Sequence, residues 1–183
     1  PIVRVALHDH VFAPHPFLEN EGTGADGGFA EDLGLLCIRG AGAGLKGDRS
    51  GTFWPFWKLI KALGDEDRAP RLVVLENVCG ALSSHDGKDF AAISSALSNN
   101  GYRFGAVVIN AVHFLPQSRP RLFIIGVRKS SPIPRALVAD GPEGEWHPSA
   151  LVEAYGKLSK RAQSSWEWWR LPAPPARTSI FAD

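Results

Sequence analysis

A glutamate directly follows an apolar run of four residues. Glu76 comes after Leu72 to Leu75, and Asn77 follows it. Such a run is typical of a strand buried on both faces of a parallel sheet, and in open α/β sheets ligands bind outside the carboxyl ends of the strands. Burial there would favour a protonated carboxyl that acts as a hydrogen-bond donor or general acid near neutral pH. Capping of the following turn is an alternative role for Glu76.

Two arginines and a glutamine follow one another at intervals of two residues. Gln117, Arg119 and Arg121 would project from one face of an extended chain. Two guanidinium groups beside one amide suit an anion or the edge of a base, since arginine offers paired donors to phosphate, carboxylate or carbonyl oxygen. A pair of ordinary surface arginines at the start of a strand explains the spacing equally well.

The remaining reactive residues do not form a site by spacing. Cys37 and Cys79 are too few for a disulfide framework and lack the spacing of a redox or zinc motif. The histidines near the amino terminus follow no metal-ligand spacing, so we expect a solvated loop there and no metal site.

Hydrophobic periodicity predicts the elements that would position these residues. Strands are typical of the apolar runs, and helices of the segments with apolar residues at helical spacing. A loop of only 115–120 between two strands favours an antiparallel pair. The tryptophans at 166–169 show no period, and we expect them to pack against sequence outside the chain. The predicted elements are a helix at 53–63 capped by Thr52, a strand at 71–78, a helix to residue 99 capped by Asp86 with Asp89 and stopped by Gly101, strands at 106–114 and 121–127, and a helix from Ser149.

Composition and charge limit the class of protein. The chain has 183 residues, 44% hydrophobic and 21% charged, which is typical of a folded domain. It has neither an apolar run long enough to span a membrane nor a signal peptide, so we expect a soluble protein of the cytoplasm. Residues 1–37 hold one basic and six acidic residues against a net charge of +1 for the chain. The remainder is therefore basic, which favours a nucleic-acid partner.

Several of these stretches together resemble the DNA cytosine-5 methyltransferase family. They are Glu76-Asn77-Val78, Asn110 to Phe114, and Pro116 to Gly126, whose order, spacing and strand context agree with the family. Gly44 to Trp54 is similar to the segment after the family's catalytic loop. The resemblance covers residues 38–129, and it implies an α/β fold of the Rossmann-like, S-adenosylmethionine-dependent methyltransferase type, a three-layer αβα sandwich that is incomplete here.

The resemblance also implies roles for the candidate residues. In this family a cysteine thiolate adds to carbon 6 of a cytosine flipped out of double-stranded DNA, and a glutamate assists at ring nitrogen 3. Glu76 would be that glutamate, and Asn77 would shape the pocket. Arg119 and Arg121 would hold the cytosine oxygen, the glutamate or a phosphate, and Gln117 would orient the cluster.

The sequence departs from the family at the nucleophile and the cofactor site. Counting back from Ile38 places the Pro-Cys-Gln cysteine at Leu33, which cannot react. Cys37 is nearby, but it has neither the proline nor the glutamine beside it, and we do not expect it to be the nucleophile. The family implies S-adenosylmethionine as cofactor, yet its Phe-x-Gly-x-Gly loop, its ribose-binding acid and its asparagine-glycine segment are missing, so no cofactor-binding residue is assigned.

These patterns predict three segments and one function. Residues 1–37 lack the family resemblance, residues 38–129 are a portion of the catalytic domain, and residues 130–183 begin a truncated target-recognition region. Because methionine is absent and the chain opens on Pro1, we expect a fragment. The implied activity is methyl transfer to carbon 5 of cytosine in DNA, as part of a restriction–modification system with a cognate endonuclease, although we expect this chain to be inactive alone. The alternatives are a pseudo-enzyme that binds DNA or complements a second polypeptide, and a non-functional gene fragment.

Overall fold

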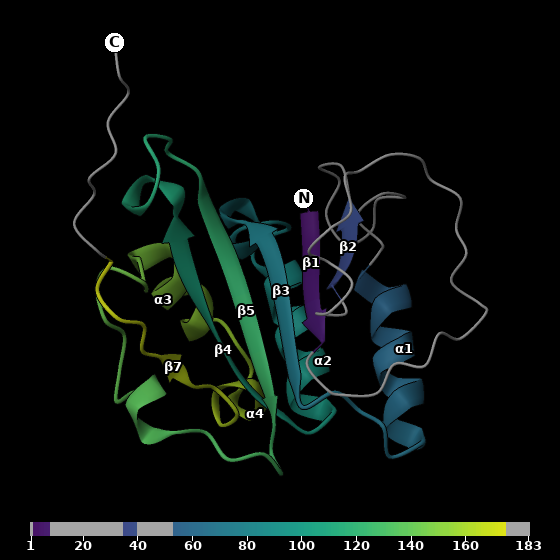
Figure 1. Ribbon diagram of the computed structural model, residues 1–183. Helices are drawn as coiled ribbons and strands as arrows, with labels where there is room; N and C mark the ends of the chain where they lie inside the picture. The colour runs from purple at the N-terminus through teal and green to yellow at the C-terminus, as the bar shows by residue number, and fades with distance from the viewer. Residues whose placement is uncertain (1, 8–34, 40–52, 175–183) are drawn as a thin grey trace.

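The computed structural model describes residues 2–7, 35–39 and 53–174, and the side chains of residues 53–174. These residues form a mixed α/β structure with one five-stranded sheet and a second sheet of two short strands (Figure 1). The strands are β1 (Ile2–Leu7), β2 (Leu35–Arg39), β3 (Leu72–Val78), β4 (Tyr102–Asn110), β5 (Pro120–Arg128), β6 (Val138–Ala139) and β7 (Trp168–Trp169). The α-helices are α1 (Phe53–Asp65), α2 (Lys88–Asn99), α3 (Ser149–Gly156) and α4 (Lys160–Gln163), and the short 3-10 turns are η2 (Cys79–Leu82), η3 (Ala111–His113) and η4 (Arg135–Leu137).

The order of the large sheet corrects one prediction. The strands lie in the order β2-β1-β3-β5-β4, and every neighbouring pair is antiparallel. The prediction that β3 lies within a parallel ladder is therefore wrong. The short connection between β4 and β5 permits only an antiparallel pair, as predicted. Since β5 enters the sheet between β3 and β4, it separates the two strands that run in the same direction.

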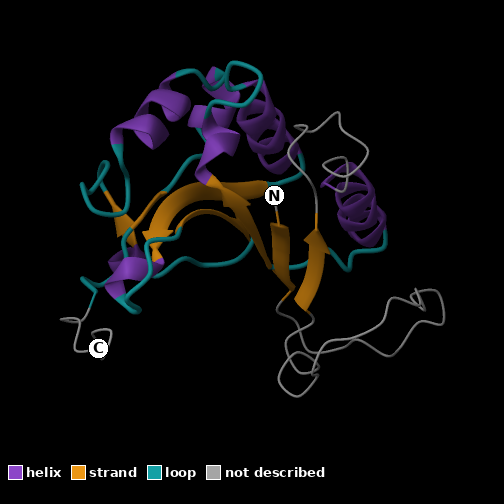
Figure 2. Ribbon diagram, turned by 90° about the horizontal axis from the view of Figure 1, so that it is seen from above, coloured by secondary structure: helices purple, strands orange, loops and turns teal. Residues whose placement is uncertain are grey.

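The main core lies between the sheet and the helices. The α-helices lie over one face of the curved sheet (Figure 2). As its apolar periodicity predicts, α1 buries Phe53, Phe56 and Ile60, and α2 likewise buries Phe90 and Leu97. The α/β class predicted from the sequence is confirmed. A second, smaller cluster of Val107, Trp146 and Trp169 lies on the other face of the sheet, and the three-layer arrangement stays a prediction.

The start of α2 differs from the predicted cap. The helix begins at Lys88 after Gly87, which has φ 81°, and no side chain caps it. His85 and Asp86 also have positive φ, so the chain turns in the left-handed region before the helix and Asp86 does not reach the cap position. Asp89 instead accepts a hydrogen bond from Ser84 Oγ at 2.6 Å. The predicted stop is confirmed, because Gly101 takes φ 80° directly after the helix end.

The segment that follows β5 covers the outer edge of β4. The Phe104 N–H donates to Ser165 O at 2.8 Å, and the Glu167 N–H donates to Phe104 O at 2.7 Å. Trp166 packs edge-on against Phe104, with ring centroids 5.4 Å apart, and it is 9% exposed. The expectation that these tryptophans pack against sequence outside the chain is therefore wrong, because Trp166 contacts Phe90 of α2 and Phe104 of β4, and Trp169 Nε1 donates to Ile125 O of β5. This segment also closes an otherwise unpaired strand edge.

The helix predicted from Ser149 is interrupted in the structure, because α3 ends at Gly156 and α4 begins at Lys160. Leu151 and Leu158 are buried in the main core, while the basic side chains of Lys160 and Arg161 are exposed. These bases form a solvated face.

Candidate functional site

Glu76 and Arg121 meet across the pair of strands β3 and β5. The register places Glu76 opposite Phe123 and Val78 opposite Arg121, so Arg121 is the diagonal neighbour of Glu76 on the same face of the sheet. The Nε of Arg121 lies 3.5 Å from Oε1 of Glu76. Their side chains are 23% and 10% exposed, respectively. The structure therefore brings two of the predicted site residues together at the carboxyl end of β3.

This pair lies on the face of the sheet opposite the main core. Leu75 and Leu122 belong to the core beneath the helices, and side chains alternate along a strand. Glu76 and Phe123 therefore point to the other face. Since a buried carboxylate is costly without a compensating charge, the guanidinium of Arg121 stabilises Glu76 in this place. The 3-10 turn η2 begins without a side-chain cap, so Glu76 does not cap that turn.

Cys79 follows this strand end directly, and the sequence patterns did not single it out as part of the site. Burial raises the pKa of the Cys79 thiol above its usual range, and the nearby charge of Arg121 opposes that effect only in part. A thiol with a raised pKa is mostly protonated and is a poor nucleophile. Cys79 therefore lies near the pair without being suited to attack a base.

Asn77 points to the opposite face from Glu76 because the two residues are adjacent on one strand. Its Oδ1 accepts a hydrogen bond from the Val78 N–H at 2.8 Å, which fixes the chain where β3 ends. Among the described residues, this local hydrogen bond is the contact that the structure shows for the Asn77 side chain. Its predicted part in shaping a pocket stays a prediction.

Gln117 and Arg119 lie in the loop before β5, which begins at Pro120. The extended run predicted through all three residues is shorter than expected, because only Arg121 lies in the strand. Gln117 and Arg119 are both exposed. Among the described residues, the guanidinium of Arg119 makes no hydrogen bond or ion pair, so it is available to a ligand.

Asn110, at the end of β4, organises this loop. Its Oδ1 accepts hydrogen bonds from the backbone N–H groups of Val112 and Arg119, and its Nδ2 donates to Ser118 Oγ. The sequence patterns placed Asn110 within a family motif but gave it no role. A polar residue at a strand end, directly before a loop that carries candidate residues, is the signal that could have identified it.

The doubtful nucleophile cannot be placed at the site. Cys37 lies in β2, where its backbone is paired with Arg4 of β1, and its side chain lies outside the described part of the structure. Leu33, the position that the family motif would give to the cysteine, also lies outside the described residues.

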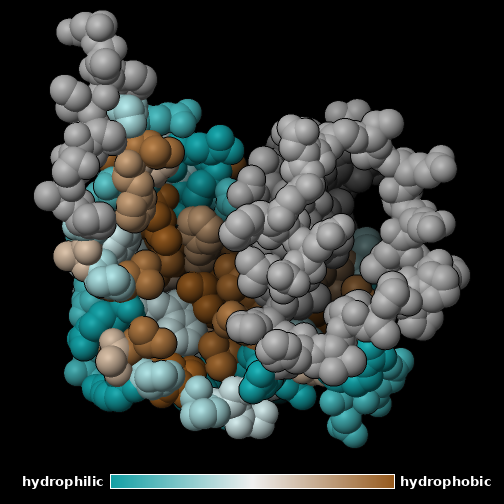
Figure 3. All heavy atoms as spheres, viewed as in Figure 1, coloured by the Kyte–Doolittle hydropathy of each residue, from teal (hydrophilic) through white to brown (hydrophobic). Residues whose placement is uncertain are grey.

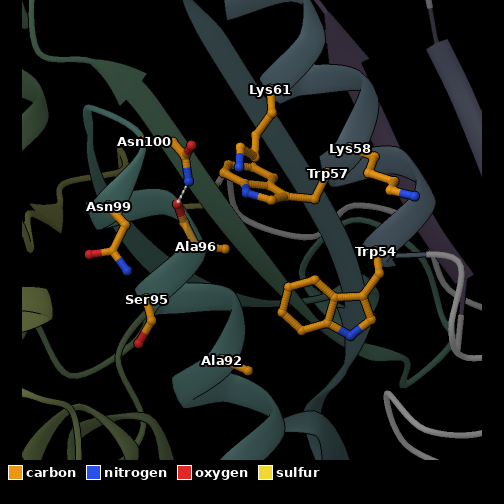
Figure 4. Close-up of a pocket in the computed structure, with 9 residues that line it drawn as sticks. All are labelled: Trp54, Trp57, Lys58, Lys61, Ala92, Ser95, Ala96, Asn99 and Asn100. Atoms are coloured by element: carbon orange, nitrogen blue, oxygen red, sulfur yellow. Dashed lines mark hydrogen bonds between the residues drawn. The ribbon is translucent and has the colours of Figure 1, made fainter.

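A pocket of about 540 Å³ lies between α1 and α2 (Figure 4). Trp54, Trp57, Lys58 and Lys61 line it from α1, and small and amide side chains line it from α2. Among the described residues, the lining holds no carboxylate to accept hydrogen bonds from a ribose, which S-adenosylmethionine requires. The pocket therefore does not fit this cofactor, and it contains none of the predicted site residues.

Two other kinds of site find no support in the described residues. The described residues contain no group of three or more histidine, cysteine, aspartate or glutamate side chains that could hold a metal ion. None of the helices in the described part of the chain is long and apolar enough to cross a membrane.

Comparisons with known proteins agree with the motifs. A family model described as C-5 cytosine-specific DNA methylase matches residues 37–165, more than half of the chain. The orphan methyltransferase M.SPBetaI of Bacillus phage SPbeta is 34% identical over 97 residues, which is 52% of this chain and 21% of the phage protein. The type II methyltransferase M.NgoFVII of Neisseria gonorrhoeae is 35% identical over 86 residues, 46% of this chain and 22% of that protein.

A more distant relative matches a longer stretch. The type II methyltransferase M.DdeI of Desulfomicrobium norvegicum is 30% identical over 115 residues, 60% of this chain and 24% of that protein. The matched part of the chain thus spans less than a third of the length of these relatives. The family match covers both strands that carry the Glu76–Arg121 pair and the loop that carries Arg119. The chain belongs to the C-5 cytosine-specific DNA methylase family.

Proposed function

We propose that this chain carries the glutamate and arginine part of a site that methylates carbon 5 of cytosine in double-stranded DNA. The observation that supports this most is the 3.5 Å contact between the nearly buried Glu76 and Arg121 at the end of a strand, within the family match. In such a site Glu76 faces ring nitrogen 3 of a cytosine flipped out of the duplex. Once the Glu76 carboxyl has taken up a proton, it donates a hydrogen bond to nitrogen 3, which draws electrons from the ring and assists addition of a thiolate at carbon 6.

Arg121 and Arg119 have different parts in this proposal. Arg121 holds Glu76 in place and offers its remaining donors to the cytosine oxygen. The exposed guanidinium of Arg119 takes a phosphate or the same oxygen, because arginine can donate two parallel hydrogen bonds to either group. Gln117, on the same loop, orients this cluster, and Asn77, whose side chain lies on the other face of β3, shapes the pocket through the backbone that its hydrogen bond to Val78 fixes.

The family's cofactor, S-adenosylmethionine, supplies the methyl group. The pocket between α1 and α2 does not fit it, and we propose that it is bound outside the described residues. The 183 residues also contain no Pro-Cys-Gln motif. We therefore propose that this chain does not transfer methyl groups by itself.

A binding experiment tests the proposed base pocket. Duplexes that carry one mispaired cytosine or one mispaired thymine lower the cost of base flipping equally. Cytosine accepts a hydrogen bond at nitrogen 3, whereas thymine donates one there. The chain should prefer the unpaired cytosine, and Glu76→Ala should abolish this preference. Equal binding of both duplexes by the unmutated chain would contradict the proposal.

A transfer assay tests the proposed inactivity. Labelled S-adenosylmethionine and mixed-sequence DNA are incubated with the chain and with its Cys37→Ala and Glu76→Ala variants. We expect no methyl transfer by any of them. Transfer that is lost in both variants would instead make Cys37 a displaced nucleophile.

A complementing subunit is the second candidate function, and the partly covered face of the sheet favours it. Phe123, Ile125 and Val127 of β5 pack against Trp146 and Trp169 on the face that carries Glu76, but they are only partly buried. Figure 3 shows apolar surface over the central strands on this face. A polypeptide that carries the missing nucleophile and cofactor motifs could cover these residues and complete the site. Methyl transfer that appears only when the chain is mixed with such a segment from a relative would support this function.

The names of the relatives and the proposed substrate support a cellular setting. Two relatives described above are named type II methyltransferases. We propose that the complete protein modifies DNA in the cytoplasm, alongside a cognate restriction endonuclease. A neighbouring endonuclease gene whose product cuts the unmethylated target sequence would support this setting.

A non-functional gene fragment remains the alternative, and absence of all DNA binding by the folded chain would favour it. The target-recognition region proposed to begin near residue 130 stays a prediction.

A further inference from the structure

Asn110 joins the two ends of the loop that carries Gln117 and Arg119. Its Oδ1 accepts hydrogen bonds from the N–H of Val112 at 3.2 Å and from the N–H of Arg119 at 2.8 Å. Its Nδ2 donates to Ser118 Oγ at 3.2 Å. One side chain thus links the first turn of the loop, η3, to the last two residues before β5.

The strand pairing explains why a side chain is needed at this position. Asn110 lies opposite Pro120 in the register of β4 and β5. Proline has no N–H and cannot donate to the ladder. The N–H of Arg119 donates to the Asn110 side chain instead, and the Ala111 N–H donates to Arg119 O at 3.2 Å. A side chain therefore fixes the start of β5 where a backbone hydrogen bond is missing.

We propose that Asn110 is a positioning residue of the base pocket, acting through the backbone of Arg119. This inference rests on the proposed function. A loop that must become ordered when it binds DNA loses conformational entropy at that moment, and this loss weakens binding. Asn110 orders residues 111–119 beforehand, so the guanidinium of Arg119 starts close to its bound position.

Three substitutions separate the acceptor oxygen of Asn110 from its donor nitrogen. Asn110→Asp keeps both accepted hydrogen bonds and loses the donation to Ser118. Ser118→Ala removes only the partner of that donation. Asn110→Ala removes all three contacts. Affinity for the duplex with an unpaired cytosine should fall about tenfold in Asn110→Ala and by less than about threefold in the other two.

A double-mutant cycle with Arg119→Ala shows whether Asn110 acts through that arginine. Once the guanidinium is removed, Asn110→Ala should cost little further affinity, because there is no longer a side chain to position. A residue that merely stabilised the fold would instead lower affinity by the same factor in both backgrounds. The amide of Arg119 should exchange slowly with solvent in the unmutated chain and in Asn110→Asp, and rapidly in Asn110→Ala.

The outcomes distinguish this inference from the proposed function. If Glu76→Ala weakens binding and Asn110→Ala does not, the positioning role is wrong while the proposed function stands. Additive losses in the cycle, or loss of affinity in Asn110→Asp while the Arg119 amide stays protected, would also overturn the role. If the unmutated chain does not prefer the unpaired cytosine, both fail. Should Asn110→Ala not fold, Asn110→Gln replaces it, because it shifts the same groups by one methylene and should weaken binding similarly.

Discussion

The contact between Glu76 and Arg121 can be tested through stability as well as binding. Removing the guanidinium leaves a nearly buried carboxylate with less compensation. Arg121→Met should therefore lower the free energy of unfolding by about 1–3 kcal/mol, and Arg121→Lys by less. Arg119→Met is the matched control, because that side chain is exposed, and it should change stability by less than about 0.5 kcal/mol. Urea denaturation measures all three, and equal losses at the two arginines would contradict the assigned pairing.

Tyr102 offers a second test at the scale of one residue. Its ring is fully buried, its hydroxyl donates to Pro70 O at 2.8 Å, and burial raises its pKa to about 12. The native state therefore holds the phenol proton more tightly than the unfolded state, whose pKa is near 10.0. The stability due to the neutral phenol is fully present below pH 10 and is lost as the pH rises towards 12.

The substitution Tyr102→Phe isolates this effect. It should cost about 1 kcal/mol at neutral pH, because the hydrogen bond is lost. The free energy of unfolding of the Tyr102→Phe variant should also fall less than that of the unmutated chain between pH 10 and pH 12. Parallel stability curves for the two proteins in this range, measured by urea denaturation, would contradict the assigned pKa direction.

At the scale of elements, the crossing of the 165–169 segment over β4 depends on Gly105. A Cβ at this position would lie 1.8 Å from Glu167 O, which is backbone and cannot move alone. Gly105→Ala should therefore destabilise the protein by at least about 1–3 kcal/mol. Gly141→Ala is the control, because nothing lies within 4 Å of a Cβ there. Thermal unfolding of both variants measures the difference, and equal melting temperatures would show that the segment does not cross β4 this closely.

The turn before α3 should be sensitive to acid through His147. This ring is 3% exposed and its Nδ1 accepts a hydrogen bond from the Glu143 N–H at 2.9 Å. Burial lowers the pKa of His147 below its ordinary value of 6.5. The native state therefore favours the neutral ring, and the stability it contributes is present above pH 6.5 and is lost as the pH falls through the folded-state pKa.

The substitution His147→Gln removes this titration. The stability difference between the unmutated chain and the variant should shrink as the pH falls below 6.5, since only the unmutated chain must take up a proton on a buried ring. A difference that stays constant with pH, measured by urea denaturation, would rule out this source of acid sensitivity.

At the scale of the whole molecule, the family-like strands and the segment after residue 130 share one core. Leu151, Ala162 and Trp166 belong to the same cluster as Phe90 and Phe104. We therefore expect a chain that ends at residue 129 to lose the cooperative unfolding of the longer chain, because it loses these contacts and uncovers the edge of β4. Circular dichroism during heating tests this, and a cooperative transition in the shortened chain would show that residues 1–129 fold without the segment that follows.

Much of the local structure could be predicted because it depends on short-range patterns. The helix at α1 and the stop at Gly101 follow from apolar spacing and from a residue that tolerates positive φ. The cap of α2 could not be predicted, since the residues of the left-handed turn, His85 and Asp86, contact Asp89 and the distant Lys157. In the site, residue types and spacing indicated Glu76 and Arg121, but no local pattern gave Asn110 its role.

The sequence by itself determined the family, the candidate residues and the antiparallel pairing of β4 with β5. Motif spacing and loop length are local properties, so they can be seen without a structure. Only the tertiary structure decided that β5 enters between β3 and β4, which makes Arg121 the diagonal neighbour of Glu76. It also decided that Trp166 packs into the main core rather than against other sequence. These outcomes depend on contacts between segments far apart in the chain, whose choice of partner is settled by the packing of the whole core.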